Sequence, residues 1–232
     1  MKVYLINLDK NKTRLAHMKA QLMNSGIEFE RIPAVYGKSL SVDEMHRGVA
    51  SFRALCAMGR SMTRGEIGCA LSHLSIYKMI DEPVCVLEDD IDFSGNLKAA
   101  LNECFAFLDV EKPRVVILSG HCFSTTSQAR FVPVSAALCA DAYCINKAAA
   151  LIIAKANYPI VSVADSWGRW SRRYGIQIYR FNPPIVRQNN AGFGTDISAS
   201  IRARHGLYWV GYKVGRVFTK LIDSLHFCLF GN

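Results

Sequence analysis

The sequence lacks the features that mark several common protein classes. It has eight cysteines but no CxxC pair, and most cysteines stand beside apolar residues. This favours small buried side chains in a reducing compartment over a disulfide framework or a zinc site. No apolar run is long enough to cross a bilayer, and the stretch before Asp9 is too short for a secretory signal. No repeat, low-complexity tract or Gly/Ser-rich linker divides the 232 residues. We therefore expect one cytoplasmic domain with a full core.

Acidic residues are in short supply. The chain has 19 Asp and Glu against 28 Lys and Arg, a formal net charge of +9. This balance favours an anionic partner, such as nucleic acid, an anionic membrane surface or a phosphorylated small molecule. Against that background, four carboxylates gather in the stretch EPVCVLEDDIDF (82–93), directly after the apolar run 84–87.

Strand-like and helical segments alternate along the chain. Gly26 is a plausible stop for the first helix, Thr63 and Glu66 form a capping-box pattern, and Asn146 can cap an alanine-rich helix. We expect strands at 2–8, 27–35, 83–88, 114–120, 142–146 and 176–181, with helices at 9–26, from 63 onward, and at 97–108, 147–156 and 166–175. Residues 36–62 are expected to form a long excursion over the surface. The alternation predicts an α/β fold with a mainly parallel sheet flanked by helices, which binds its ligands at the carboxyl ends of the strands.

The carboxylate cluster lies where such a sheet binds ligands. If the strand continues, Glu88 and Asp90 point to one face and Asp89 to the other. Two neighbouring carboxylates repel each other unless a cation lies between them, and oxygen ligands of this kind suit Mg²⁺ or Mn²⁺. The alternative is a solvated junction between strand and loop, which we also expect for Asp92.

Seven blocks of the sequence carry a family resemblance. They are VYLINLDKNKTRLAHM, FERIPAVYGKSL, MTRGEIGCALSHLSIYKMI, VCVLEDDIDF, DAYCINKAAALII, VADSWGRW and PPIVRQ. In this order, over residues 3–188, they resemble glycosyltransferase family 25, the bacterial lipooligosaccharide galactosyltransferase group. The resemblance implies a GT-A-like (Rossmann-related) fold and an inverting, metal-dependent transfer of a hexose. The implied donor is a UDP-sugar, usually UDP-galactose, and the implied acceptor is a lipooligosaccharide.

The resemblance also implies roles for individual residues. Glu88 and Asp90 match the acidic motif that would hold Mn²⁺ or Mg²⁺ on the donor diphosphate, and Asp165 matches an acidic residue that we take as the catalytic base. Asp89 would reach the donor from the opposite face of the strand. Further contacts to the donor are expected from Asn7, Leu8, Arg14, Glu66, Ser72 and His73.

Several of these residues have a structural alternative. Asp165 can cap the helix that follows it, and Glu66 is engaged by its capping box. His73 can be a packed core residue, and Arg14 can lie on a solvated helix face. Three further polar residues stand at positions suited to a site: His121 after a strand, and Gln188 and Asn189, which we expect near the acceptor.

The C-terminal segment has its own pattern. We separate a domain at 1–200 from a basic segment at 201–232, in which five Lys and Arg face one Asp. Apolar residues from Leu207 to Leu225 repeat at spacings of three and four, and Lys213 and Lys220 lie on the opposite side. This predicts an amphipathic helix on the anionic inner face of the cytoplasmic membrane, or a helix packed on the domain.

Two other functions remain open at this point. A metal-dependent nucleotidyltransferase also uses paired carboxylates on an α/β sheet, but it would carry a glycine-rich phosphate loop, and NLDKNKTR after the first strand has no glycine. A basic nucleic-acid-binding module would interleave aromatic and basic residues in a compact motif, which is not seen before the C-terminal segment. We therefore expect a glycosyltransferase with no nucleic-acid partner.

Overall fold

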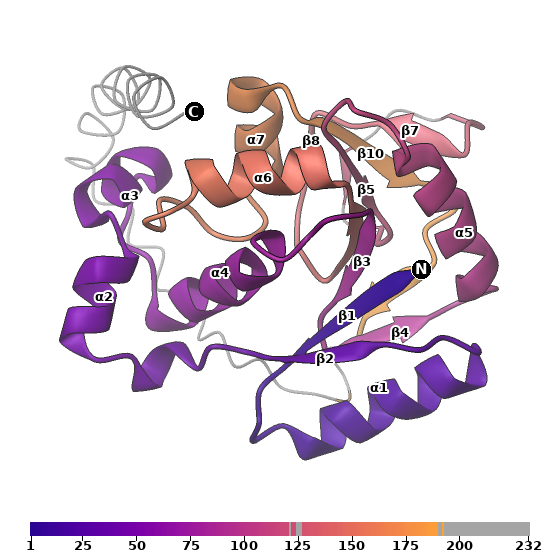
Figure 1. Cartoon of the computed structure of the whole chain (residues 1–232), viewed down its shortest axis with the longest axis horizontal. Coiled ribbons are helices and arrows are strands. Elements are labelled where there is room, and N and C mark those ends of the chain that lie inside the picture. Colours follow the sequence, from indigo (N-terminus) through magenta and orange to yellow (C-terminus); the bar gives the residue numbers. More distant parts are fainter. Residues whose placement is uncertain (121, 124–126, 190–191, 193–232) are drawn as a thin grey trace.

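A seven-stranded sheet forms the centre of the molecule (Figure 1). The computed structural model describes residues 1–120, 122–123, 127–189 and 192. The strand order is β2-β1-β3-β9-β5-β10-β7. The strands span Lys2–Asn7 (β1), Glu30–Pro33 (β2), Val84–Leu87 (β3), Arg114–Ile117 (β5), Phe131–Pro133 (β7), Ala142–Ile145 (β9) and Gln177–Phe181 (β10).

The sheet is mixed but mainly parallel. β1 pairs in parallel with both β2 and β3, and β5 pairs in parallel with β10. β9 is inserted antiparallel between β3 and β5, and β7 closes one edge antiparallel to β10. Five strands therefore point one way and two point the other, which confirms the predicted fold class. The carboxyl ends of β1 and β3 lie side by side at one edge of the sheet.

Helices cover both faces of the sheet (Figure 1). The alternation of side chains along the strands builds two apolar cores. Tyr4 and Val86 face the core that receives α4 (Arg64–Tyr77), α6 (Lys147–Ala156) and α7 (Trp167–Tyr174). Leu5 and Leu87 face the other core, which receives α1 (Lys12–Asn24) and α5 (Leu97–Leu108). The sheet is thus the middle layer of three.

Local signals fix the ends of two helices. The Thr63 side chain accepts a hydrogen bond from the backbone N–H of Glu66, whose carboxylate accepts one from the Thr63 N–H, so the predicted capping box is present. Asn146 caps α6 by accepting from the Ala149 N–H, as predicted. Its amide also donates to carbonyl groups in the loop after α5, which ties that loop to the helix start.

The segment 36–62 is more regular than predicted. It contains a 3₁₀ turn η1 (Gly37–Ser39) and two helices, α2 (Val42–Gly48) and α3 (Ser51–Met58). α2 begins at a Ser41/Glu44 capping box, and α3 ends at Gly59, whose φ of 70° lies in the left-handed region. Both helices are short, so the periodic pattern is too weak to identify them. A small third core joins this segment to α4 and comprises Val49, Ala54, Ile67, Ala70, Leu74 and Ile160.

Two pairs of short strands lie outside the seven-stranded sheet, and one of these pairs is next to the carboxylates. β4 (Ile91–Phe93) follows them and pairs antiparallel with β11 (Val186–Gln188). β6 (Cys122–Phe123) and β8 (Ala136–Ala137) form a second small pair.

Three of the cysteines serve as the predicted small core residues. Cys85, Cys104 and Cys144 are buried on the α1/α5 side of the sheet. Within the described ranges, none of the helices is both long and apolar enough to cross a membrane. His121 and the predicted C-terminal helix lie outside the described residues.

Candidate active site

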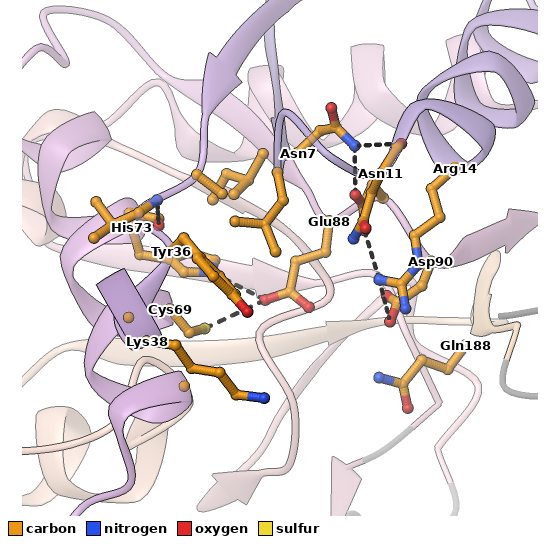
Figure 2. Close-up of a pocket in the computed structure, with 18 residues that line it drawn as sticks. Asn7, Asn11, Arg14, Tyr36, Lys38, Cys69, His73, Glu88, Asp90 and Gln188 are labelled. Carbon is orange, nitrogen blue, oxygen red and sulfur yellow. Dashed lines mark hydrogen bonds and ion pairs between the residues drawn. The ribbon is translucent and has the colours of Figure 1, made fainter. Parts of the chain in front are cut away.

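A cavity opens at the carboxyl ends of β1 and β3, between α1 and α4 (Figure 2). We call it the acidic cavity, because Glu88, Asp89 and Asp90 all line it. Eight of the ten predicted site residues line the cavity: Asn7, Leu8, Arg14, Ser72, His73, Glu88, Asp89 and Asp90. Glu66 and Asp165 are not among its described lining residues. The predicted residues that line the cavity therefore come from three separate parts of the sequence, 7–14, 72–73 and 88–90.

Asn7 organises the end of β1. Its amide donates to Asp89 at 2.6 Å and to the Asn11 carbonyl at 3.1 Å, and its oxygen accepts from Arg31 at 2.9 Å. The residue is 1% exposed. Because the amide is fully engaged inside the protein, Asn7 positions Asp89 and the start of α1.

Asp89 and Arg14 form a buried ion pair. Arg14 Nη1 lies 2.9 Å from Asp89 Oδ1 and 3.5 Å from Asp90 Oδ2. Burial raises the pKa of Asp89, and the hydrogen bonds from Asn7 and Arg14 oppose that rise. The guanidinium thus lies against two carboxylates, a more enclosed position than a solvated helix face.

Asp90 is the least satisfied carboxylate of the cavity. Its Oδ1 is buried and has no hydrogen-bond partner among the described residues. Burial, followed by the nearby charge of Glu88, raises the pKa of Asp90 to about 7, and Arg14 opposes this only in part. A buried carboxylate oxygen without a partner costs free energy, and a cation would remove that cost.

Glu88 turns toward α4. Its Oε1 lies 3.1 Å from His73 Nε2 and 3.7 Å from Cys69 Sγ. Burial acts to raise the pKa of Glu88, but its interactions with His73, Cys69 and Arg14 together outweigh burial, and the pKa is lowered. His73 is itself buried, and its Nδ1 lies 2.7 Å from the Tyr143 hydroxyl. Glu88 and Asp90 thus line one cavity, but different partners hold them.

The loop after β2 forms another wall of the cavity, which the sequence did not reveal. Tyr36 and Lys38 line the cavity from this loop (Figure 2). Two glycines let the loop cross α4 closely: a Cβ on Gly37 would lie 1.7 Å from the Arg64 carbonyl oxygen, and one on Gly68 would lie 2.5 Å from the Val35 oxygen.

Ser72 fastens the same loop. Its hydroxyl accepts from the Val35 N–H at 2.8 Å and donates to the Gly68 carbonyl at 2.7 Å. The serine that we expected at the donor therefore lines the cavity and also anchors the loop to α4.

Glu66 and Asp165 have other described partners. Glu66 completes the capping box and accepts two hydrogen bonds from Arg60. Asp165 accepts from the Cys139 N–H at 3.2 Å, and Ser166 holds the N-cap position of α7. Burial raises the pKa of Asp165, and the charges of Glu88 and Glu66 raise it further. The helix-cap alternative for Asp165 is therefore wrong, while its role as a base stays a prediction.

The last acidic residue of the stretch is not simply solvated. Asp92 Oδ1 lies 2.8 Å from His17 Nε2 and accepts from the Asn189 amide at 3.3 Å. The backbone N–H of Asn189 donates to the Asp90 carbonyl, and Gln188 lines the acidic cavity. The strand β11 thus brings the predicted acceptor residues beside the carboxylates.

The sequence matches one family model and several named proteins. Residues 1–167 match the family model described as glycosyltransferase family 25 (LPS biosynthesis protein). Procollagen galactosyltransferase 1-B of Xenopus laevis is 38% identical over 117 residues, which covers 47% of this chain and 19% of that protein. A glycosyltransferase 25 family member of Aedes aegypti is 39% identical over 103 residues, 41% of this chain and 17% of that protein. The chain thus spans less than a fifth of the length of these curated relatives.

Solved structures show a more distant likeness. A putative glucose-1-phosphate thymidylyltransferase from Bacillus anthracis shares 13% identity at a TM-score of 0.45, and the alignment covers 93% of this chain and 95% of that one. The family match itself covers well over half of the 232 residues. The chain belongs to glycosyltransferase family 25.

Proposed function

We propose that this chain is an inverting, metal-dependent glycosyltransferase. It would move a hexose, with galactose from UDP-galactose as the donor sugar, onto a lipooligosaccharide acceptor. The observation that carries this proposal is the acidic cavity: three carboxylates and Arg14 meet at the carboxyl ends of β1 and β3, in a chain of this family. Galactose is the favoured sugar because relatives from frog and mouse are named procollagen galactosyltransferases.

The residues of the cavity fit a divalent cation. Asp90 Oδ1 is buried without a hydrogen-bond partner among the described residues, and Glu88 lines the same cavity. Carboxylate oxygens are the ligands that Mg²⁺ and Mn²⁺ prefer. We propose that Asp90 and Glu88 hold the ion on the diphosphate of the donor. When bound, such an ion neutralises charge on the departing UDP as a Lewis acid.

The other residues of the cavity orient the donor and the carboxylates. Arg14 and Asn7 fix Asp89, so that the backbone around residues 88–90 is held against the end of β1. Lys38 brings a positive charge to the cavity wall, and Tyr36 brings an aromatic ring whose face lies 4.4 Å from Lys10 Nζ. We propose that this loop contacts the nucleotide, because an aromatic ring and a cation suit a base and a phosphate.

The acceptor hydroxyl must lose a proton as it attacks the sugar. We propose Asp165 as the base. The pKa of Asp165 is raised from its ordinary value toward neutral pH. Asp165 also lies near enough to Glu88 for the two charges to interact. In this arrangement the acceptor would approach from the α7 side, opposite to the nucleotide. The carboxylate would hold the proton until the product leaves.

The location of the enzyme follows from its acceptor. A lipid-linked acceptor requires access to a membrane surface, and the segment 201–232 carries five Lys and Arg against one Asp. We propose a cytoplasmic protein that associates peripherally with the inner face of the cytoplasmic membrane. Loss of liposome binding on deletion of residues 207–232 would support this. Unchanged binding of the truncated chain would contradict it.

A donor screen tests the proposed reaction. UDP release is measured from a panel of UDP-sugars with Mn²⁺ and with EDTA, for the wild type and for Asp90→Asn. We expect turnover with UDP-galactose and Mn²⁺ that EDTA abolishes and that Asp90→Asn reduces at least a hundredfold. Asp92→Asn is the matched control, because Asp92 pairs with His17 and does not line the acidic cavity. Turnover that survives EDTA, or equal losses in both variants, would refute the metal role of Asp90.

A further inference from the structure

One wall of the acidic cavity carries ligands of a different chemical kind. Cys69 and His73 stand four residues apart on α4, so both side chains lie on one face of that helix. Both face Glu88, which follows β3. The ligand atoms of these three residues all lie within 4.8 Å of one another. A thiol, an imidazole and a carboxylate thus converge at one point.

Two of the three spacings between these atoms are close to those of a tetrahedral metal site. Zinc bonds of about 2.0–2.3 Å place two ligand atoms of a tetrahedron about 3.3–3.7 Å apart. In this chain, His73 Nε2 lies 3.1 Å from Glu88 Oε1, and Cys69 Sγ lies 3.7 Å from the same oxygen. The remaining pair, Cys69 Sγ and His73 Nε2, lies within 4.8 Å, so an ion that draws these two atoms together can bond to all three ligands. Three protein ligands leave the fourth position for water.

A buried hydroxyl network supports His73 from behind. Its Nδ1 lies 2.7 Å from the Tyr143 hydroxyl, which lies 2.7 Å from the Tyr77 hydroxyl. Metal-binding histidines usually donate their second ring N–H to such an outer partner, which fixes the ring and its tautomer. Both hydroxyls can donate or accept, so this network can serve a ring whose Nε2 is free to bind an ion.

We propose that Cys69, His73 and Glu88 form a binding site for a thiophilic divalent cation, of which Zn²⁺ is the natural example. The mixed sulfur, nitrogen and oxygen ligands distinguish it from the all-oxygen pair that would hold Mn²⁺ or Mg²⁺. On binding, the Cys69 thiol releases its proton to solvent and the sulfur bonds to the ion as a thiolate. The neutral imidazole keeps one proton, which moves to Nδ1 and is donated to Tyr143.

The ion has a route to the site, because all three ligands line the acidic cavity. One consequence rests on the proposed function. Glu88 would serve both cations, so an ion held by Cys69 and His73 takes this carboxylate away from the donor. We therefore expect Zn²⁺ to inhibit transfer even when Mn²⁺ is present in excess.

Cobalt binding tests the site directly. The full chain, reduced with a non-chelating reductant, is titrated with Co²⁺ and then with Zn²⁺. We expect one equivalent of Co²⁺ to give visible bands of tetrahedral cobalt and a near-ultraviolet band from thiolate to metal, all removed by Zn²⁺. Cys69→Ser should abolish the thiolate band. His73→Gln and Glu88→Gln should weaken binding by more than about 100-fold, beyond the usual cost of losing an outer partner.

Two further sets of variants separate the site from general effects on folding. Tyr143→Phe should weaken binding about 10-fold and keep the thiolate band, since it removes only the outer partner. Cys56→Ser and His46→Gln change residues on α3 and α2 outside the cluster, and they should bind Co²⁺ like the wild type. A wild-type chain without a thiolate band, or a band that persists in Cys69→Ser, would overturn the proposal.

The activity arm keeps the two proposals distinguishable. If transfer occurs, Zn²⁺ should inhibit the wild type at least tenfold more strongly than Cys69→Ser. Equal inhibition of both would overturn the shared role of Glu88. If no donor is turned over, the proposed function fails, and the cobalt spectra still decide whether the site exists.

Discussion

The buried carboxylate of Asp90 makes a quantitative prediction about stability. Its pKa rises from an ordinary 3.8 to about 7, mainly through burial and the charge of Glu88. The side chain is 17% exposed, so solvent screens these effects only weakly. Each pKa unit corresponds to about 1.4 kcal/mol, and the rise of about three units therefore costs about 4 kcal/mol once Asp90 is ionised.

The direction of the pH dependence follows from this rise. Between pH 4 and pH 7 the folded chain holds the Asp90 proton while the unfolded chain has lost it, so stability falls as pH increases. Stability is fully retained below pH 3.8 and is lost as the pH passes through about 7. Asp90→Asn removes the titrating group. In EDTA, the variant should gain about 3 kcal/mol relative to the wild type between pH 4.5 and pH 8.

Denaturant unfolding measures this difference. Trp167 and Trp170 are buried, so their fluorescence reports on unfolding. The same denaturation experiment is repeated at pH 8 with Mn²⁺. At an Mn²⁺ concentration 100 times its dissociation constant, the ion should stabilise the wild type by about 2.7 kcal/mol, and it should stabilise Asp90→Asn by much less. Asp92→Asn controls for the loss of one negative charge. A difference between wild type and Asp90→Asn that stays constant from pH 4.5 to pH 8 would refute the reasoning.

Three further predictions concern the loop, the base and a cap. Gly37→Ala should destabilise the fold by about 1–3 kcal/mol and weaken UDP binding, because its Cβ would meet the Arg64 carbonyl. Denaturation and UDP titrations should show neither effect for Gly48→Ala, whose Cβ would meet only Leu71 Cδ2, at 4.0 Å. Asp165→Asn should retain donor binding by calorimetry but lose most transfer, and weaker folding with normal specific activity would instead indicate a structural role. Asn146→Ala should lower the free energy of unfolding by about 2 kcal/mol or more, because it removes a helix cap and several loop contacts; a change below 0.5 kcal/mol would contradict this.

Elements with strong local signals could be predicted from the sequence. α5 and α6 begin after Asn96 and Asn146, which cap them, and both have the bounds expected from the pattern. The orientation of β9 could not be predicted in the same way. A short apolar strand has the same pattern of apolar residues whichever way it runs in the sheet. The direction of β9, antiparallel between β3 and β5, therefore depends on the connection 118–141 and not on the pattern of the strand itself.

The position of the carboxylates could be predicted from the sequence pattern, but the directions of their side chains could be predicted only in part. Their place after a buried strand correctly predicted the edge of the sheet at which the cavity forms. The alternation rule holds as far as Asp89, because Glu88 turns toward α4, on the side that Val86 faces, and Asp89 pairs with Arg14 of α1, on the side that Leu87 faces. It fails at Asp90, whose Oδ2 lies 3.5 Å from the same Arg14 Nη1, because β3 ends at Leu87 and the chain bends at residues 89–90 before β4.

Tyr36 and Lys38 were missed for a different reason. Nothing in the sequence says which distant segment a loop will cross. The only local hint was a glycine in each partner, Gly37 in the loop and Gly68 in α4, and each glycine alone has many explanations. Only the structure shows that the two glycines allow a close crossing, since a Cβ on either would collide with the backbone of the other segment.

The charges of the acidic cavity also bear on the order of binding. Among its described lining residues, three carboxylates face two permanent cations, Arg14 and Lys38. A diphosphate brings further negative charge to a cavity that already has an excess, and repulsion inside a partly buried site is weakly screened. A divalent cation reverses that balance. If the proposed function is right, UDP should therefore bind far more weakly in EDTA than with Mn²⁺, and Asp90→Asn, with one negative charge fewer, should narrow this gap. An equal gap in both proteins would show that the cation acts elsewhere.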